Sequence, residues 1–201
     1  MISLVNEFFS FSKKKINVRR VKEHSLNQSS VAYYYISTYK KGMTKCMSIN
    51  LKEIINENWI ECIRLTTNED NSNTVFQKFV ASNALSIAQS KIQEGWTIKA
   101  IYEENTMVGF TMYGYSVENK FYEICRLMID HKFQRKGYGI KAMLIVIDEM
   151  RSNKDCKEVF LSFDPQNEGA KKLYEKVGFV NTGEIIDDEL LYKLNLVNYS
   201  I

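Results

Sequence analysis

The chain has 201 residues, a formal net charge of +3, 45% hydrophobic residues and 25% charged residues. These values fit one globular domain of ordinary size that can bury a core, with room for an appendage. No run approaches the ~20 consecutive apolar residues of a membrane-spanning helix, which excludes an integral helical membrane protein. Residues 1–11 lack a leading basic region and a small-residue cleavage site, so they are not expected to be a signal peptide.

The four cysteines are scattered along the chain, which has only two histidines. Because no Cys-x-x-Cys pair occurs, the spacing favours neither a zinc site nor a disulfide framework. We therefore expect no metal, and we expect a reducing, cytoplasmic location.

The positive charge is concentrated at the front of the chain. Residues 1–46 contain nine Lys or Arg and two Glu, whereas residues 47–201 contain eighteen Lys or Arg and twenty-two Asp or Glu. We predict that residues 1–46 form an accessory extension of a domain over 47–201. A basic, aromatic arm that contacts nucleic acid or an anionic membrane is the alternative.

Hydrophobic periodicity and turn residues predict a mixed α/β order from residue 47 onward. A meander of three strands comes first, and a strand, helix, strand and helix unit follows. Gly178 is the expected C-cap of the last helix. The expected strands cover 48–54, 96–102, 107–116, 121–129, 158–164, 180–184 and 190–196, and the expected helices cover 57–66, 75–91, 138–151 and 167–177.

A basic loop with the sequence QRKGYG, residues 134–139, joins the strand at 121–129 to a long helix. Backbone N–H groups at a helix start have no intrahelical partner, and the helix dipole adds partial positive charge there. Gly137 and Gly139 carry no side chain that would keep an anion away from those amides. We predict a diphosphate-binding loop, and a tight turn without a ligand is the alternative.

Two other nucleotide-binding motifs do not match this loop. It has no Gly-Lys-Ser/Thr ending, so the nucleoside-triphosphate loop is excluded. A dinucleotide fold places a third glycine three residues after Gly139, where this chain has Ala142, and an acidic residue at a strand end ~20 residues on, which this chain lacks.

The loop and a second motif together resemble the GNAT superfamily of acetyl-CoA-dependent N-acetyltransferases. The signature Gln/Arg-x-x-Gly-x-Gly/Ala stands here as Gln134-x-x-Gly137-x-Gly139, and the second element comprises Asn167, Ala170, Leu173-Tyr174 and Gly178-Phe179. The resemblance covers residues 47–196. It implies an α/β fold with a mixed, mostly antiparallel sheet of about six to seven strands, flanked by about four helices and splayed at the cofactor cleft.

The resemblance implies that acetyl-CoA binds along the strand before the loop. Its pyrophosphate would rest on the loop amides, its pantetheine arm would pair with that strand, and Asn167 would meet the arm. A β-bulge in such folds aims a backbone N–H at the thioester carbonyl. The implied cofactor-binding residues are Leu127, Met128, Ile129, Gln134, Arg135, Lys136, Gly137, Tyr138, Gly139, Ile140 and Asn167.

The resemblance also implies catalytic residues. Tyr174 corresponds to the tyrosine that protonates the departing thiolate, and a core aromatic is its alternative role. For Asn167 the alternative is a helix N-cap. Glu123 is our candidate for the base, and an exposed charge at a strand end is the alternative. Cys125 is less favoured as a nucleophile because these enzymes use direct transfer and no histidine is adjacent.

Within the superfamily, the chain most resembles bacterial polyamine acetyltransferases of the spermine/spermidine type. The stretches MSINLKEI, MVGFTMYG, RLMID and LSFDPQNEGAKKLYEKVGF carry this resemblance. A polycation needs acidic residues around the mouth of its site, and ordinary solubilising charge is the alternative role for such residues. The candidates are Glu57, Glu61, Glu69, Asp70, Asp187, Asp188 and Glu189.

Three alternatives stay open for the function. The acceptor could be a cationic antibiotic such as streptothricin or an aminoglycoside, or it could be a protein N-terminus. The chain could also be a non-catalytic acetyl-CoA or polyamine binding module. We expect a small-molecule amine as partner, with no nucleic acid and no membrane, and no sequence feature decides whether the chain forms a homodimer.

Overall fold

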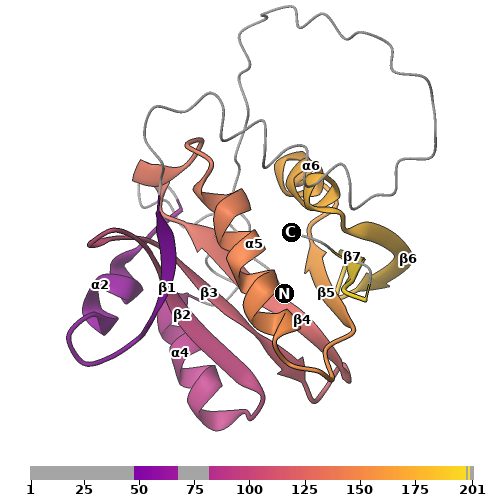
Figure 1. Ribbon diagram of the computed structural model, residues 1–201, viewed down its shortest axis with the longest axis horizontal. Helices are drawn as coiled ribbons and strands as arrows, with labels where there is room; N and C mark the ends of the chain where they lie inside the picture. Colours follow the sequence, from indigo (N-terminus) through magenta and orange to yellow (C-terminus); the bar gives the residue numbers. More distant parts are fainter. Residues whose placement is uncertain (1–47, 68–81, 198, 200–201) are drawn as a thin grey trace, which may run out of the picture.

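The computed structural model describes residues 48–67, 82–197 and 199. In these ranges seven strands form one mixed sheet in the order β1-β2-β3-β4-β5-β7-β6 (Figure 1). The strands are β1 (Ile49–Glu53), β2 (Trp96–Glu103), β3 (Thr106–Ser116), β4 (Phe121–Ile129), β5 (Glu158–Phe163), β6 (Val180–Ile186) and β7 (Glu189–Asn195). The helices are α2 (Trp59–Arg64), α4 (Asn83–Ile92), α5 (Tyr138–Arg151) and α6 (Glu168–Val177), with a 3-10 turn η1 (His131–Phe133). No helix in the described ranges is long and apolar enough to cross a membrane.

The predicted strands are all confirmed, and Gly178 closes α6 in the left-handed conformation with φ 112°. The helix predicted over 75–91 is confirmed from Asn83 onward, but Ser82 is not helical. Ser82 has extended backbone, and its Oγ accepts a hydrogen bond from the Leu85 N–H at 3.2 Å, so α4 begins only at Asn83. Residues 1–46 and 75–81 lie outside the described residues.

Side chains alternate between two apolar clusters on the opposite faces of the sheet. Ile101 and Leu127 belong to the cluster that packs against α5 and α6, whereas their neighbours Ala100 and Met128 belong to the cluster beneath α2 and α4. Figure 1 shows α5 crossing in front of the sheet. The sheet is therefore the middle layer of a three-layer fold.

The sheet splays in its middle, as expected for the fold class. Strands β1 to β4 pair antiparallel, but β4 and β5 are parallel and are matched at one register position, Glu123↔Phe160. The Phe121 and Phe160 rings stack there with centroids 4.4 Å apart. On its other edge β5 pairs with β7 along its whole length, but no residue of β5 after Phe160 is matched to β4, so β4 and β5 separate toward the end of β4 that leads into the glycine loop.

A β-bulge lies in β4 where the two strands meet. The register with β3 changes from Met112↔Arg126 to Tyr113↔Ile124, which makes Cys125 the bulge residue. The bulge breaks the alternation of the strand. Cys125 and Arg126 therefore both face the α2 and α4 side: Cys125 joins the cluster there, and the Arg126 guanidinium contacts Gln89 of α4.

Gly114 of β3 pairs with Trp96 of β2 on one side and with Glu123 of β4 on the other, close to the β4 bulge. Its φ is +150°, and a Cβ atom here would lie 1.9 Å from the Gly95 carbonyl oxygen. Only glycine permits this approach of the two backbones.

Gly114→Ala is expected to lower the free energy of unfolding by about 3 kcal/mol or more, because a backbone clash adds to the strain at positive φ. The matched control is Gly183→Ala, where φ is +84° but no atom lies within 4 Å of the added Cβ, so a loss of only about 1 kcal/mol is expected. Urea unfolding measures both losses. Equal losses would show that the close approach at Gly114 is not a constraint.

Candidate active site

The loop between β4 and α5 has the backbone conformation of an anion site. Gly137 is the N-cap of α5, with φ 85° and ψ 9°, and Arg135 also has a positive φ of 61°. Left-handed backbone costs a residue such as arginine about 1 kcal/mol or more. Alternation of this kind turns successive N–H groups toward one side, at the positive end of a 14-residue helix.

Three side chains of the loop are used to brace it. The Gln134 amide donates to the Ile129 carbonyl at 3.1 Å and to the Thr67 carbonyl at 3.3 Å. The Lys136 ammonium donates to the Lys132 carbonyl at 2.9 Å. The buried Tyr138 hydroxyl donates to the Glu103 carboxylate, and burial, followed by that carboxylate, raises the pKa of Tyr138 to about 12. These three side chains are therefore engaged within the protein.

The strand leading into the loop has one edge that β5 does not cover. On the other edge, β3 pairs with residues 127–129 of β4. On this edge the described strand β5 is matched to β4 only at Glu123. Residues 127–129 therefore have no described strand paired with them on this edge, which is the kind of edge that an extended ligand can pair with.

Asn167 and Tyr174 lie at the start and in the middle of α6. The Asn167 Oδ1 accepts the Ala170 N–H at 3.0 Å, so its role as N-cap is confirmed. Tyr174 is fully buried, and its ring packs against those of Phe163 and Phe179. The alternative role of Tyr174 as a core aromatic is therefore confirmed for its ring. The packing of the ring does not account for the hydroxyl group.

The Tyr174 hydroxyl is a buried polar group with no hydrogen-bond partner among the described residues. Burial, with a smaller effect of the Glu189 carboxylate, raises the pKa of Tyr174 well above its usual value. The phenol therefore stays neutral and keeps its proton. A buried hydroxyl without a partner costs free energy, so this atom is the part of the core most suited to meet a ligand.

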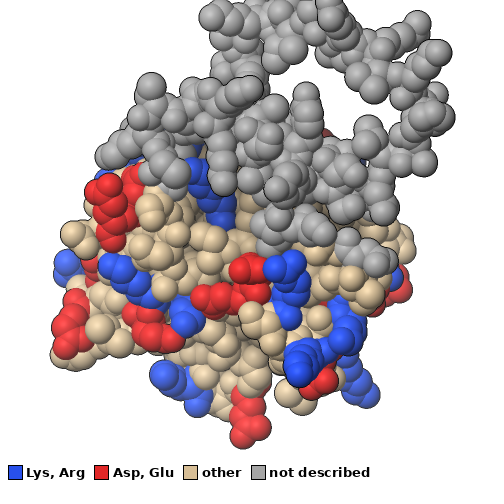
Figure 2. Space-filling view, in the orientation of Figure 1, with Lys and Arg blue, Asp and Glu red and all other residues tan. Residues whose placement is uncertain are grey.

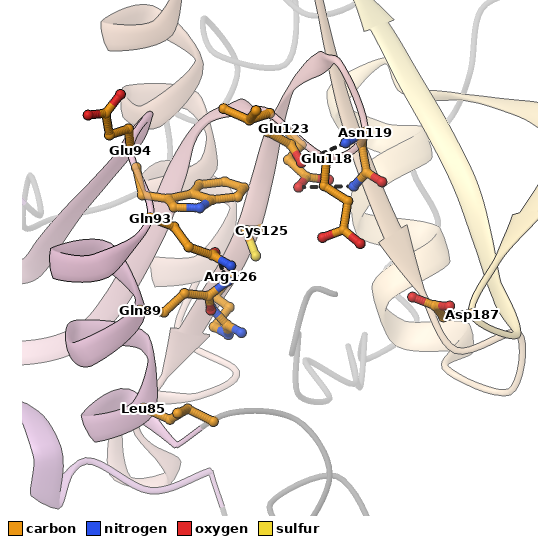
Figure 3. Close-up of a pocket in the computed structure, with 13 residues that line it drawn as sticks. Leu85, Gln89, Gln93, Glu94, Glu118, Asn119, Glu123, Cys125, Arg126 and Asp187 are labelled. Atoms are coloured by element: carbon orange, nitrogen blue, oxygen red, sulfur yellow. Dashed lines mark hydrogen bonds between the residues drawn. The ribbon is translucent and has the colours of Figure 1, made fainter.

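A cavity of about 660 Å³ opens on the α4 side of β4 (Figure 3). Helix α4 forms one wall, β4 forms the floor, and the turns after β3 and β6 form the far side. Four carboxyl groups and one guanidinium line it. The lining residues are Leu85, Gln89, Gln93, Glu94, Trp96, Ser116, Val117, Glu118, Asn119, Glu123, Cys125, Arg126 and Asp187.

Glu123 lies on the floor of this cavity and is only 5% exposed, so the alternative of an exposed strand-end charge is wrong. Burial raises the pKa of Glu123, while hydrogen bonds from Asn119 and Ser116 oppose that shift. A carboxylate with a raised pKa is a stronger base than an exposed one. Cys125 lines the same floor, and burial raises the pKa of its thiol, which keeps it protonated and makes it a poor nucleophile.

The acidic residues predicted for the mouth are only partly the ones that line the cavity. Asp187 lines it, but Glu57 and Glu61 on the α2 side do not, and Glu189 is buried, where its carboxylate accepts a 2.6 Å hydrogen bond from the Ser162 hydroxyl. Glu69 and Asp70 lie outside the described residues. On the face shown in Figure 2 the two signs of charge are mixed, as on an ordinary solubilising surface.

Sequence reasoning missed three charged residues of the cavity. Glu94 follows α4, Glu118 lies in the β3–β4 turn, and Arg126 lies on β4. The first two carry no periodic signal, because each is a single charge in a polar segment. Arg126 faces the cavity only because the bulge changes the alternation of β4.

Comparison with known proteins agrees with this geometry. Residues 53–179 match the Acetyltransferase (GNAT) family. A spermine/spermidine N(1)-acetyltransferase of Bacillus subtilis is 28% identical over 145 residues, which are 69% of this chain and 92% of that protein. The family match over residues 53–179 includes the glycine loop, strands β4 and β5, and α6.

Two solved structures show the same fold at low identity. The PaiA N-acetyltransferase from Thermoplasma acidophilum in complex with coenzyme A has a TM-score of 0.54 and 19% identity, covering 74% of this chain and 99% of that chain. The spermidine N-acetyltransferase from Vibrio cholerae in complex with CoA and spermine has a TM-score of 0.56 and 15% identity, covering 72% and 92%. The protein is thus an N-acetyltransferase by class. It belongs to the GNAT acetyltransferase family.

Tyr174→Phe is expected to leave the free energy of unfolding unchanged or to raise it by up to about 1 kcal/mol, because it removes a buried hydroxyl that lacks a partner. The control is Tyr199→Phe, which removes a hydroxyl that donates to the Val177 carbonyl at 3.0 Å and should cost about 1 kcal/mol. Denaturant unfolding compares the two. A loss at Tyr174 as large as that at Tyr199 would mean that the Tyr174 hydroxyl has a structural partner.

Proposed function

We propose that the protein transfers the acetyl group of acetyl-CoA to a primary amine of a polyamine such as spermine or spermidine. The observation that carries this proposal is the acidic cavity that opens at the β4 bulge, where β4 and β5 separate. The thioester donor and the amine acceptor would approach this point from opposite ends of β4.

The donor would enter from the glycine loop. Backbone amides over residues 135–140 would hold the diphosphate, and the edge of residues 127–129 would pair with the pantetheine arm. Asn167, whose Oδ1 caps α6, would meet the arm at the start of that helix. When bound, acetyl-CoA supplies an acetyl group activated as a thioester.

The acceptor would enter from the cavity. The carboxylates of Glu94, Glu118 and Asp187 are exposed around its rim, where they attract and hold ammonium groups. The buried Glu123 would take the proton that the attacking amine must lose. The relative from Bacillus subtilis, named for spermine and spermidine, supports an acceptor of this chemistry.

Tyr174 would protonate the departing thiolate. Its hydroxyl has no partner in the described structure, and its raised pKa means that it arrives with its proton. The same burial that raises the pKa of the phenol also raises that of a thiol, so the two groups shift in the same direction in a dry site. Position, more than intrinsic acidity, would make this tyrosine an acid.

The direct test is release of free coenzyme A thiol from acetyl-CoA with spermine, spermidine, streptothricin, an aminoglycoside and a short peptide as separate acceptors. We expect turnover with the two polyamines at the highest kcat/KM. A preference for the antibiotic or the peptide would replace the proposed acceptor. Acetyl-CoA binding with no transfer to any amine would show a non-catalytic binding module.

Glu123→Gln is expected to lower kcat/KM for spermidine by about 100-fold or more, because general base catalysis typically contributes a factor of that size. Rates of the parent enzyme should rise with pH through the raised pKa of Glu123, since only the carboxylate form accepts a proton. That rise should vanish in the variant, leaving only the rise that belongs to the amine itself.

Glu118→Gln serves as the control, since Glu118 is an exposed carboxylate on the rim of the same cavity. It should raise KM for spermidine while the pH profile keeps its shape. An unchanged profile in Glu123→Gln would exclude Glu123 as the base.

A further inference from the structure

Arg126 is a buried cation in the wall of the acceptor cavity that the proposed chemistry does not use. Its side chain is 8% exposed and lines the cavity next to Cys125. Figure 3 shows it beside Gln89, on the inner side of the cavity. The bulge at Cys125 places it on this face, where an undisturbed strand would have turned it away.

The contacts of Arg126 are made to neutral groups. Its Nη1 donates to the Gln89 Oε1 at 3.0 Å and lies 2.9 Å from the Met112 sulfur. Its Nε is buried and has no hydrogen-bond partner among the described residues. No carboxylate of the described chain forms an ion pair with it. A buried charge is normally paired with an opposite charge. Because Arg126 has no such partner among the described residues, its positive charge acts on any molecule that enters the cavity.

The guanidinium is not arranged as a clamp for an anion. Bidentate binding of a carboxylate uses two neighbouring N–H groups that point the same way. Here Nε is enclosed and Nη1 is already engaged, so neither fork of the guanidinium is open. Arg126 therefore acts on a bound molecule through its charge rather than through paired hydrogen bonds.

The other charged groups facing the cavity are arranged differently. Glu94 beside α4, Glu118 in the β3–β4 turn and Asp187 in the β6–β7 turn are exposed at the rim. On β4 itself, Glu123 and the Cys125 thiol are buried beside Arg126. Charge thus changes from negative at the rim to a mixture of one carboxyl group and one guanidinium at the floor.

We propose that Arg126 is a positioning charge that keeps the reacting amine neutral, while the rim carboxylates hold the remaining ammonium groups of the same molecule. This inference rests on the proposed polyamine acetyltransferase function. The amine that reaches the floor loses its first proton to water as it binds, because a second cation beside Arg126 is disfavoured, and Glu123 takes the second proton as the amine attacks. The site therefore selects acceptors with two or more amines spaced along a chain, and it disfavours monoamines.

The size of the effect follows from Coulomb's law. A unit charge about 7 Å away, at an effective dielectric constant of about 20, lowers the pKa of an amine by roughly one to two units. Arg126 also lowers the pKa of Glu123, so its loss would raise the pKa of base and amine together. Both changes move the rising part of the rate profile toward alkaline pH.

The test compares kcat against pH for spermidine in the parent enzyme, in Arg126→Gln and in Arg126→Lys. The rising limb should move up by about one pH unit or more in Arg126→Gln, whereas Arg126→Lys keeps the charge and should keep the limb. Acetyl-CoA affinity and the unfolding transition check that both variants fold. A lower rate with an unmoved limb in Arg126→Gln would overturn the proposal, since a structural role alone gives that result.

A second measurement does not depend on turnover. Calorimetry of spermidine binding to the coenzyme A complex, in buffers of different ionisation enthalpy, counts the protons released. The parent protein should release about one proton per spermidine near neutral pH, and Arg126→Gln should release fewer. Binding without proton release in the parent would overturn the role of Arg126 even if acetyl transfer is found.

The two experiments also separate this inference from the function on which it rests. Proton release by spermidine without acetyl transfer would retain the charge arrangement and refute the enzyme activity. Transfer to carboxylate-bearing amines that is lost in Arg126→Gln, with polyamines spared, would instead make Arg126 an anion clamp and overturn the proposal.

Discussion

The separation of β4 from β5 is the constraint on which the rest of the structure depends. The two strands share one register position at Glu123↔Phe160 and then diverge, while β5 takes β7 as its partner. A strand edge with unmet hydrogen-bonding groups is costly unless something covers it. Here residues 127–129 have no described strand paired on this edge, and the glycine loop follows them in the chain. The bulge and the cavity lie on the same strand, β4.

Charge in the cavity is organised by depth. The exposed carboxylates at the rim stay ionised at little free-energy cost. They attract cations without holding them in one geometry. Glu123 and Arg126, on the floor, carry a desolvation cost that only function or compensating contacts explain. The buried Tyr174 hydroxyl is a third polar group of this kind, on the other side of the splay. The proposed function gives each of these three groups a role.

Much of the fold could be predicted because its signals are local. Gly137 and Gly178 mark the start of α5 and the end of α6, and alternating apolar residues mark the strands. The α4 boundary was missed because Ser82 lies inside an amphipathic pattern, and a single polar residue in such a pattern does not reveal that its backbone is extended and caps a helix. The prediction from local sequence patterns failed at the start of α4, where a helix meets the segment before it.

From the sequence, residues could be proposed for the donor side of the candidate site, but few of the residues that line the cavity could be named. The glycine loop is a run of consecutive residues at a helix start, so a sequence pattern can detect it. The cavity instead combines α4, β4 and two turns that are far apart in the sequence. Arg126 shows the limit best. Counting by twos from Glu123 places Cys125 correctly but turns Arg126 to the wrong face, because one extra residue in β4 reverses the alternation.

The order of strands in the second half of the sheet has a consequence for synthesis on the ribosome. Strand β7 is made after β6, yet it lies between β5 and β6. A nascent chain that ends at β6 therefore has β5 matched only to β4, and the hairpin whose turn carries Asp187 has not closed. Domains fold as units as they emerge, so the acceptor cavity gains its far wall only once β7 has left the exit tunnel. The cavity at the β4 bulge is thereby complete only in chains that have been translated through β7.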